Sequence, residues 1–308
     1  MRMESIMNAN VMRSRVMKMI PLITMMIWGS MYVASRVVLQ SMPALLLLFL
    51  RFSISGALLL GIAKMKGMRM IRKEDFKELL VIAFFGYFIS NGALLLGIQY
   101  SNASFSSLIN ALSPVLISVF AVFLLKEKMN RQQFIALLIA VAGAFVIIGN
   151  PGESVTLSGV ALCTASLVLW SFIVIRIKRL TDKYDPIVVT GASMALAAVP
   201  ALPGALVWMH VTGETAVITP GLLLPLGYVC VVCTAFAHLL WNKALSEEDA
   251  TRCAAFYPFQ PVTSMAMGIL FLGEDCSMKF MMGMVLILFS ILIRQMHFHH
   301  SQLRPAAA

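Results

Sequence analysis

Ten apolar runs, each long enough to cross a lipid bilayer, constrain the fold of this chain more than any other feature. A transmembrane helix needs about 20 mainly apolar residues. Hydrophobic residues make up 60% of the chain and charged residues 12%, whereas ordinary soluble domains have about 45–50% and about 25%. The sequence therefore predicts an all-α integral membrane protein with ten transmembrane helices. The expected spans lie at roughly 17–39, 43–63, 78–98, 104–125, 133–149, 158–176, 186–209, 220–241, 251–272 and 277–295.

The basic residues predict how these spans are oriented. Of the 24 Lys and Arg residues, 21 lie in the N-terminal tail, in every second connection, or at the C-terminal end. Connections rich in Lys and Arg face the cytoplasm. We therefore expect a protein of the cell membrane with both termini cytoplasmic. Topology accounts for the net charge of +10, so no nucleic-acid partner is expected.

The chain also contains an internal duplication. The string ASFSSLINALSPVLISVFAVFLLKEK matches ATRCAAFYPFQPVTSMAMGILFLGED further along, and a segment around Trp28 matches one around Trp170. Five expected spans precede Asn150 and five follow it. The two long strings align, 147 residues apart, at Ala103 and Ala250, at Pro114 and Pro261, and at Glu127 and Glu274.

An odd number of spans in each copy means that the second copy enters the membrane upside down. The charges agree, because LLKEK at the end of the first string is basic and FLGED in the second is acidic. The sequence thus predicts two inverted five-helix repeats, residues 1–150 and 151–308. Inverted repeats are a transporter architecture, with the substrate site near the bilayer midplane where the repeats meet.

These residues resemble the drug/metabolite transporters built from two EamA domains. The resemblance covers about residues 19–293 and includes Trp28-Gly29-Ser30 and Arg51-Phe52 as well as the paired strings. It implies a ten-helix inverted-repeat fold that moves small metabolites, often amino acids or their derivatives, usually outward. The second half departs from the first, because Trp170 is followed by Ser171-Phe172 and Pro258 has no proline counterpart.

Prolines inside two expected spans predict broken helices. A proline removes one helical hydrogen bond and clashes with the carbonyl four residues earlier, so Pro114 frees the Asn110 carbonyl and Pro261 that of Tyr257. Broken helix is tolerated in a membrane where it is buried in protein or lines a wet cavity. Either these breaks line a substrate path, with Ser113 and Gln260 beside them, or neighbouring Ser and Thr side chains satisfy the freed groups.

Other polar and aromatic residues within the spans are further candidates. Asn91 and His238 are again 147 residues apart, and each either lines a cavity or makes an interhelical hydrogen bond. Trp28 and Trp170 either stack on substrate or pack between helices, while Trp208 and Trp241, near span ends, are expected to anchor at the membrane interface. The predicted substrate-binding residues are Trp28, Asn91, Asn110, Ser113, Pro114, Trp170, His238, Tyr257, Gln260 and Pro261.

Charges bear on energy coupling. All 14 acidic residues fall in connections or at span ends, so proton antiport through a buried carboxylate lacks its central group. Arg51, the one clearly internal charge, either attracts a substrate carboxylate or pairs with carbonyls. Coupling is therefore either absent or runs through His238, whose ordinary pKa of about 6.5 suits proton transfer.

Cofactors and catalytic chemistry are not expected. Cys230 and Cys233 form a lone C-x-x-C within an apolar run, and no P-loop string occurs. We therefore expect no metal, no cofactor and no enzyme, in a monomer or homodimer whose partners are lipid and a small-molecule substrate. A secondary transporter of a small polar metabolite, exporting by alternating access, fits best. The alternatives are a proton-coupled multidrug exporter and, less well supported, a non-transporting membrane protein.

Overall fold

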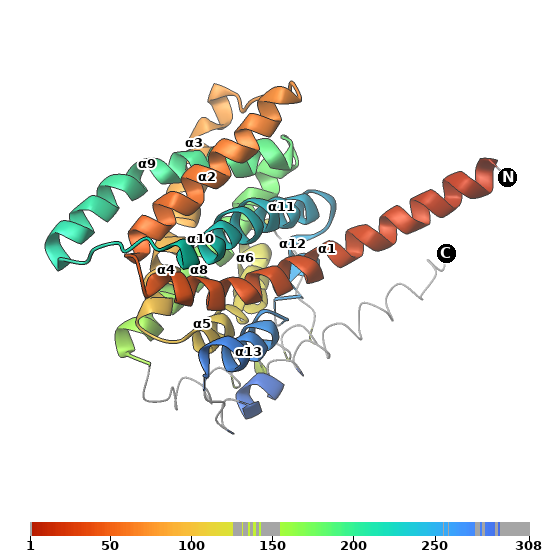
Figure 1. Ribbon diagram of the computed structural model, residues 1–308. Coiled ribbons are helices and arrows are strands. Elements are labelled where there is room, and N and C mark those ends of the chain that lie inside the picture. The colour runs from red at the N-terminus through yellow and green to blue at the C-terminus, as the bar shows by residue number, and fades with distance from the viewer. Residues whose placement is uncertain are drawn as a thin grey trace.

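The computed structural model shows an all-helical bundle in the part of the chain that it describes (Figure 1). The described residues are 2–125, 131, 135, 138–139, 142, 155–254, 256–257, 259–274, 278, 281–286 and 289. The helical elements are α1 (Arg2–Leu39), α2 (Ala44–Met65), η1 (Lys73–Asp75), α3 (Phe76–Val81), η2 (Ile82–Ser90), α4 (Asn91–Gln99), α5 (Ala103–Asn110), α6 (Ser113–Leu125), α8 (Leu157–Thr181), α9 (Pro186–Thr212), α10 (Pro220–Gly227), η3 (Tyr228–Phe236), α11 (Ala237–Glu247), α12 (Ala250–Ala254) and α13 (Phe259–Leu272).

Seven segments among the described residues are long and apolar enough to cross a membrane. They correspond to the first four and to the sixth, seventh and eighth predicted spans, and α12 with α13 covers the ninth. The predicted spans 133–149 and 277–295 lie largely outside the described residues. The seven segments are Met19–Leu39, Ala44–Met65, Lys73–Gln99, Ala103–Leu124, Leu157–Thr181, Pro186–Thr212 and Pro220–Glu247.

Local signals explain where several helices begin and end. The Thr156 hydroxyl accepts a hydrogen bond from the Gly159 N–H at the start of α8, and Asp185 accepts one from Ile187 at the start of α9. These side chains satisfy backbone donors that a helix N-terminus leaves without partners. Helix α9 ends at Gly213, whose φ of 71° lies in the left-handed region that favours glycine.

Helices α2 and α9 pack antiparallel through small residues. A Cβ added at Gly56 would lie 2.8 Å from the Ala195 backbone nitrogen, and one added at Gly191 would lie 3.0 Å from Leu59 Cβ. Such close backbone approach is typical of helix pairs in membranes. The pairing places the end of α2 beside the start of α9, and the far end of α9 beside the start of α2.

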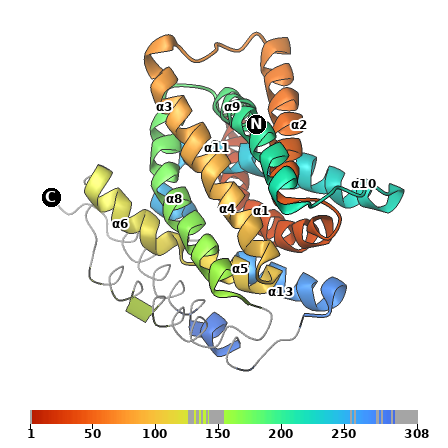
Figure 2. The same ribbon diagram turned by 90° about the vertical axis from the view of Figure 1, so that its left-hand side faces the viewer.

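The third and eighth spans contain a feature that the sequence did not predict. Each changes from α-helix to a nine-residue π-helical segment, η2 in the third and η3 in the eighth, and then returns to α-helix. The third span, formed by α3, η2 and α4, runs between α8 and α9 (Figure 2). π-Helical turns occur often at functional sites, and each segment ends just before a predicted site residue, Asn91 or His238.

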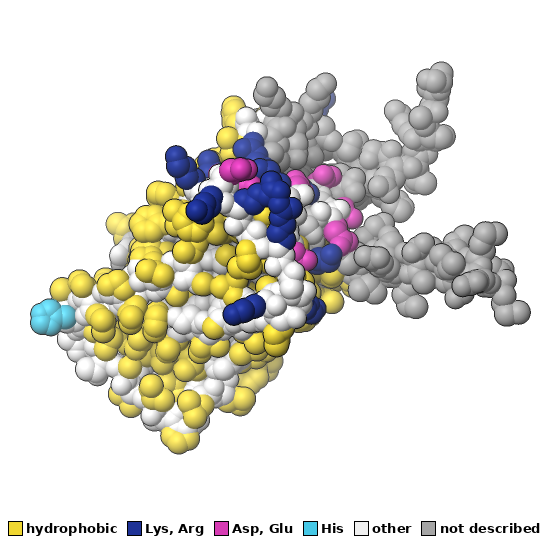
Figure 3. All heavy atoms as spheres, turned by 90° about the horizontal axis from the view of Figure 1, so that it is seen from above, with side chains coloured by type: hydrophobic (Ala, Val, Ile, Leu, Met, Phe, Trp, Pro, Cys, Tyr) yellow, Lys and Arg dark blue, Asp and Glu magenta, His cyan; other side chains and the backbone are white. Residues whose placement is uncertain are grey.

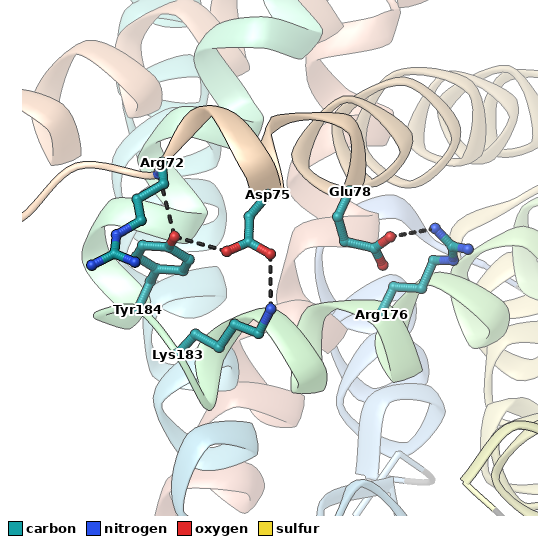
Figure 4. Close-up of polar contacts among 6 residues, drawn as sticks. All are labelled: Arg72, Asp75, Glu78, Arg176, Lys183 and Tyr184. Carbon is teal, nitrogen blue, oxygen red and sulfur yellow. Dashed lines mark hydrogen bonds and ion pairs between the residues drawn. The ribbon is translucent and has the colours of Figure 1, made fainter.

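One end of the bundle is basic and joins segments far apart in sequence. Figure 3 shows Lys and Arg side chains gathered at one end, with hydrophobic side chains over much of the remaining surface. At this end Lys183 binds Asp75 at 2.8 Å and Arg176 binds Glu78 at 2.7 Å (Figure 4). The hydrogen bond from Lys183 to the Asp75 carboxylate raises the pKa of the exposed Lys183 ammonium group. The basic second and sixth connections therefore share one end of the bundle.

Candidate functional site

A cavity lies among side chains from both halves of the chain. It comprises about 380 Å3 of space not filled by atoms, part of which is open to solvent. None of its twelve described lining residues is an Asp, Glu, Lys or Arg. The lining residues are Trp28, Met31, Tyr32, Ser90, Asn91, Leu94, Asn110, Ser166, Trp170, His238, Tyr257 and Gln260.

Seven of the ten predicted substrate-binding residues line this cavity. The three that do not are Ser113, Pro114 and Pro261, each next to or near a helix break. The cavity brings together both members of the pair Asn91 and His238. The seven lining residues are Trp28, Asn91, Asn110, Trp170, His238, Tyr257 and Gln260.

The helix breaks bring side chains, rather than free carbonyls, to the cavity. Between α5 and α6 the Asn110 carbonyl accepts a hydrogen bond from the Ser113 hydroxyl at 2.6 Å. Between α12 and α13 the Tyr257 carbonyl accepts one from the Gln260 N–H at 2.9 Å. Ser113 thus satisfies the backbone, whereas the side chains of Asn110, Tyr257 and Gln260 lie at the cavity wall. Pro258 lies outside the described residues.

Aromatic rings form much of the cavity wall. The ring centroid of Trp28 on α1 lies 6.1 Å from that of Trp170 on α8 and 4.9 Å from that of His238 on α11, in edge-to-face arrangements. Aromatic pairs favour this geometry at such distances. The interpretation of Trp241 as an interface anchor was wrong. Its side chain is fully buried, 5.6 Å from Trp28 and 5.3 Å from Tyr257 between ring centroids, so it packs behind the cavity.

A backbone hydrogen bond determines which ring nitrogen of His238 donates. Its Nδ1 lies 3.0 Å from the carbonyl oxygen of Thr234. Because a carbonyl only accepts, this contact requires a proton on Nδ1, and Nε2 is an acceptor when the ring is neutral. The Thr234 hydroxyl in turn donates to the Val229 carbonyl within η3, five residues earlier. The π-helical segment therefore orients His238.

The remaining polar wall has long or weak hydrogen bonds. The Tyr32 hydroxyl lies 3.4 Å from Gln260 Oε1, and Gln260 Nε2 donates to the thioether of Met25 at 3.2 Å. A thioether is a weak acceptor. The side chain of Gln260 is thus buried with donor and acceptor capacity only partly used.

Arg51 is fully buried beside this wall without a carboxylate among its described partners. Its Nε donates to the Thr234 hydroxyl at 2.9 Å, and Nη2 donates to the Met31 thioether at 3.2 Å. Its Nη1 has no hydrogen-bond partner among the described residues. One expected role of Arg51 was pairing with carbonyls, but Nε and Nη2 bind a hydroxyl and a thioether instead. Arg51 is not among the described lining residues, but Met31, which it contacts, is.

Five cavity residues were missed by sequence reasoning, although helical spacing points to most of them. Met31 and Tyr32 follow Trp28 by three and four residues, Leu94 follows Asn91 by three, and Ser166 precedes Trp170 by four. Residues with these separations share one face of a helix. Ser90, at the end of η2, gave no such signal.

The described part of the chain offers no metal site. No group of three His, Cys, Asp or Glu side chains within it is placed to hold an ion. The C-x-x-C pair, Cys230 and Cys233, consists of buried free thiols in η3.

This chain is similar to several proteins that are named as transporters. An uncharacterized transporter of Archaeoglobus fulgidus is 27% identical over 271 residues, covering 88% of this chain and 95% of that protein. An uncharacterized inner membrane transporter of Salmonella typhimurium, YicL, is 24% identical over 282 residues, covering 88% and 92%. A probable amino-acid metabolite efflux pump of the same organism is 25% identical over 285 residues, also covering 88% and 92%.

A solved structure shares the fold of this chain, and the model of one protein family matches its sequence. A solved crystal structure superimposes with a TM-score of 0.70 at 20% identity, covering 93% of this chain and 98% of that one. The model of the EamA-like transporter family matches twice, at residues 17–149 and 157–294. The chain is a membrane protein of the EamA-like transporter family.

Proposed function

We propose that this protein is a secondary transporter that exports a small polar metabolite, an amino acid or a related compound, across the cell membrane. Transport proceeds by alternating access between two inverted five-helix repeats, residues 1–150 and 151–308. Both termini lie in the cytoplasm, and the protein works in the bilayer as a monomer or homodimer. Substrate contacts come from the cavity residues, above all Trp28, Asn110, His238, Tyr257 and Gln260.

This proposal rests mainly on the finding that residues from both halves of the chain line the cavity. Asn91 and His238 line it together, as do Asn110 and Tyr257, and each pair is separated by the same 147 residues that align the duplicated strings. A site between related halves is where transporters with inverted repeats bind substrate. A cavity that both halves line can open to either side as the halves move.

The chemistry of the wall supports the substrate class. Aromatic and apolar side chains alternate with a few amides and hydroxyls, as in pockets for small organic molecules. The described lining residues include no carboxylate to attract a lipophilic cation, which argues against a multidrug exporter. A name given to one relative, a probable amino-acid metabolite efflux pump, supports export of amino-acid metabolites.

Counterflow in liposomes tests the proposal. Purified protein is reconstituted into liposomes loaded with unlabelled amino acids, and uptake of each labelled amino acid is compared with that of protein-free liposomes. We expect accumulation of at least one amino acid. Accumulation of a lipophilic cation such as tetraphenylphosphonium, with no amino acid transported, would instead establish the multidrug alternative.

A matched pair of variants links transport to the cavity. Gln260→Leu removes the donor and acceptor of a side chain that is 2% exposed at the cavity wall. Gln40→Leu makes the same change in the turn after α1, where the side chain is exposed. We expect Gln260→Leu to abolish counterflow and Gln40→Leu to retain it, at equal amounts of folded protein.

A further inference from the structure

The two cavity tryptophans use their indole N–H groups differently. Trp28 on α1 and Trp170 on α8 both line the cavity, and their ring centroids are 6.1 Å apart. Trp170 Nε1 donates to the Tyr257 hydroxyl oxygen at 2.7 Å. Trp28 Nε1 is buried and has no hydrogen-bond partner among the described residues. One indole is therefore satisfied by the protein, and the other is not.

The internal duplication shows which partner Trp28 lacks. Asn110 precedes Tyr257 by the 147 residues that align the two strings, so Asn110 corresponds to the residue that accepts from Trp170. Asn110 also lines the cavity, yet its described side-chain bond is a long donation to the Ser106 carbonyl at 3.4 Å. The half of the wall formed by Trp28 and Asn110 thus lacks the hydrogen bond that the other half makes.

An unsatisfied donor in this position costs folding free energy. Buried polar groups in proteins are nearly always hydrogen-bonded, and those that are not call for an explanation. Phenylalanine would fill similar space at position 28 without that cost. Trp241 Nε1 is likewise buried without a described partner, but Trp28 differs from Trp241 in lining the cavity, where a substrate can supply the acceptor.

A buried charge that contacts the cavity wall favours one kind of acceptor for this donor. Arg51 donates to the thioether of Met31, which follows Trp28 by one helical turn. It also donates to the Thr234 hydroxyl, and the carbonyl of Thr234 accepts from His238. His238 in turn contacts the Trp28 ring. Arg51 has no carboxylate among its described partners, so no acidic group in the described part of the chain neutralises its charge by direct contact. In a region of low dielectric constant, such a charge favours an anionic group at the adjoining wall.

We propose that the Trp28 indole N–H binds a carboxylate oxygen of the substrate, and that Arg51, in contact with the lining residue Met31, selects the carboxylate by its charge. Trp170 has a different role, because it holds Tyr257 in place and contributes no free donor. Trp28 is therefore a substrate-binding residue and Arg51 a specificity-determining one. This inference rests on the proposed function, since it concerns the solute that the cavity carries.

Matched tryptophan variants test the inference. Wild-type protein, Trp28→Phe and Trp170→Phe are reconstituted, and counterflow of the amino acid that the wild type transports best is inhibited with unlabelled amino acids and with their carboxamides. A carboxamide keeps the side chain and the amino group but lacks the negative charge. We expect the wild type to prefer acids over carboxamides. Trp28→Phe should raise the half-inhibiting concentration of the acids about tenfold or more, while the carboxamides change less.

The paired variant controls for packing. Trp170→Phe also replaces an indole of the wall, but it removes a hydrogen bond within the protein. We expect it to lower thermal stability and, whatever its effect on overall transport, to keep the wild-type ratio between inhibition by acids and inhibition by carboxamides. If Trp28→Phe leaves the acid inhibition unchanged, or lowers acid and carboxamide inhibition equally, the carboxylate site is overturned although transport stands. If the wild type transports no amino acid, the proposed function itself is refuted, whatever the variants show.

A charge variant keeps the test decisive should Trp28→Phe fold poorly. Asn110→Asp adds a carboxylate to the same wall with little change in shape. We expect it to weaken inhibition by the acids and to leave the carboxamides nearly unaffected, because two carboxylates repel each other. Unchanged inhibition by the acids in folded Asn110→Asp protein would contradict an anion site at this wall.

Discussion

Gly29 on α1 lies directly against the backbone of Gln260 on α13. A Cβ added at Gly29 would stand 2.7 Å from the Gln260 carbonyl oxygen and 2.6 Å from Thr263 Cβ. Because Gln260 also lines the cavity, this contact couples the packing of the two helices to the position of a cavity side chain. The glycine of the Trp-Gly-Ser string therefore has a steric role.

Gly29→Ala should destabilise the protein by about 1–3 kcal/mol, because the backbone at Gln260 must shift to admit the methyl group. Thermal stability in detergent, followed by size-exclusion chromatography after heating, measures the effect. Gly61→Ala on α2 is the matched control, since an added Cβ there meets no atom within 4 Å. Equal stability of the two variants would contradict the contact.

Tyr257→Phe should destabilise the protein by about 1–3 kcal/mol, because the Trp170 indole N–H then loses its acceptor while remaining buried. The double variant Trp170→Phe/Tyr257→Phe removes both partners, so its loss should be smaller than the sum of the two single losses. Thermal melting of all four proteins in one detergent measures the coupling. Strictly additive losses would show that the hydrogen bond contributes nothing.

His238→Gln tests energy coupling. His238 is the one histidine among the described lining residues, so we expect transport either to ignore a pH gradient or to lose its response to the gradient in this variant. His210→Gln, on the exposed last turn of α9, is the control. Uptake into liposomes with and without an imposed gradient is measured. A gradient that still drives uphill transport in His238→Gln would place the proton site elsewhere.

Membrane topology is testable with single cysteines. The antiparallel pairing of α2 with α9 puts Met68, after α2, and Gly213, after α9, at opposite ends of the bundle. In a cysteine-free background, a label at Met68 should react only from the cytoplasm and one at Gly213 only from outside. Reaction of both positions from the same side would refute the inverted topology.

Much of the fold was predictable because it depends on local properties of the chain. Hydropathy over about 20 residues and the Lys and Arg of the connections do not depend on the rest of the fold, and the seven membrane-length helices fall where these patterns predict them. The duplication likewise pointed to residues such as Asn91 and His238, because related halves place corresponding residues near a common interface.

Tertiary packing decided what those residues do, and no local pattern contains that information. The π-helical segments before Asn91 and His238, the burial of Trp241 and the capture of the Asn110 carbonyl by Ser113 all depend on neighbouring atoms. The same holds for the two indoles. Trp28 and Trp170 look alike in the sequence, and only the position of the Tyr257 hydroxyl distinguishes a satisfied donor from a free one.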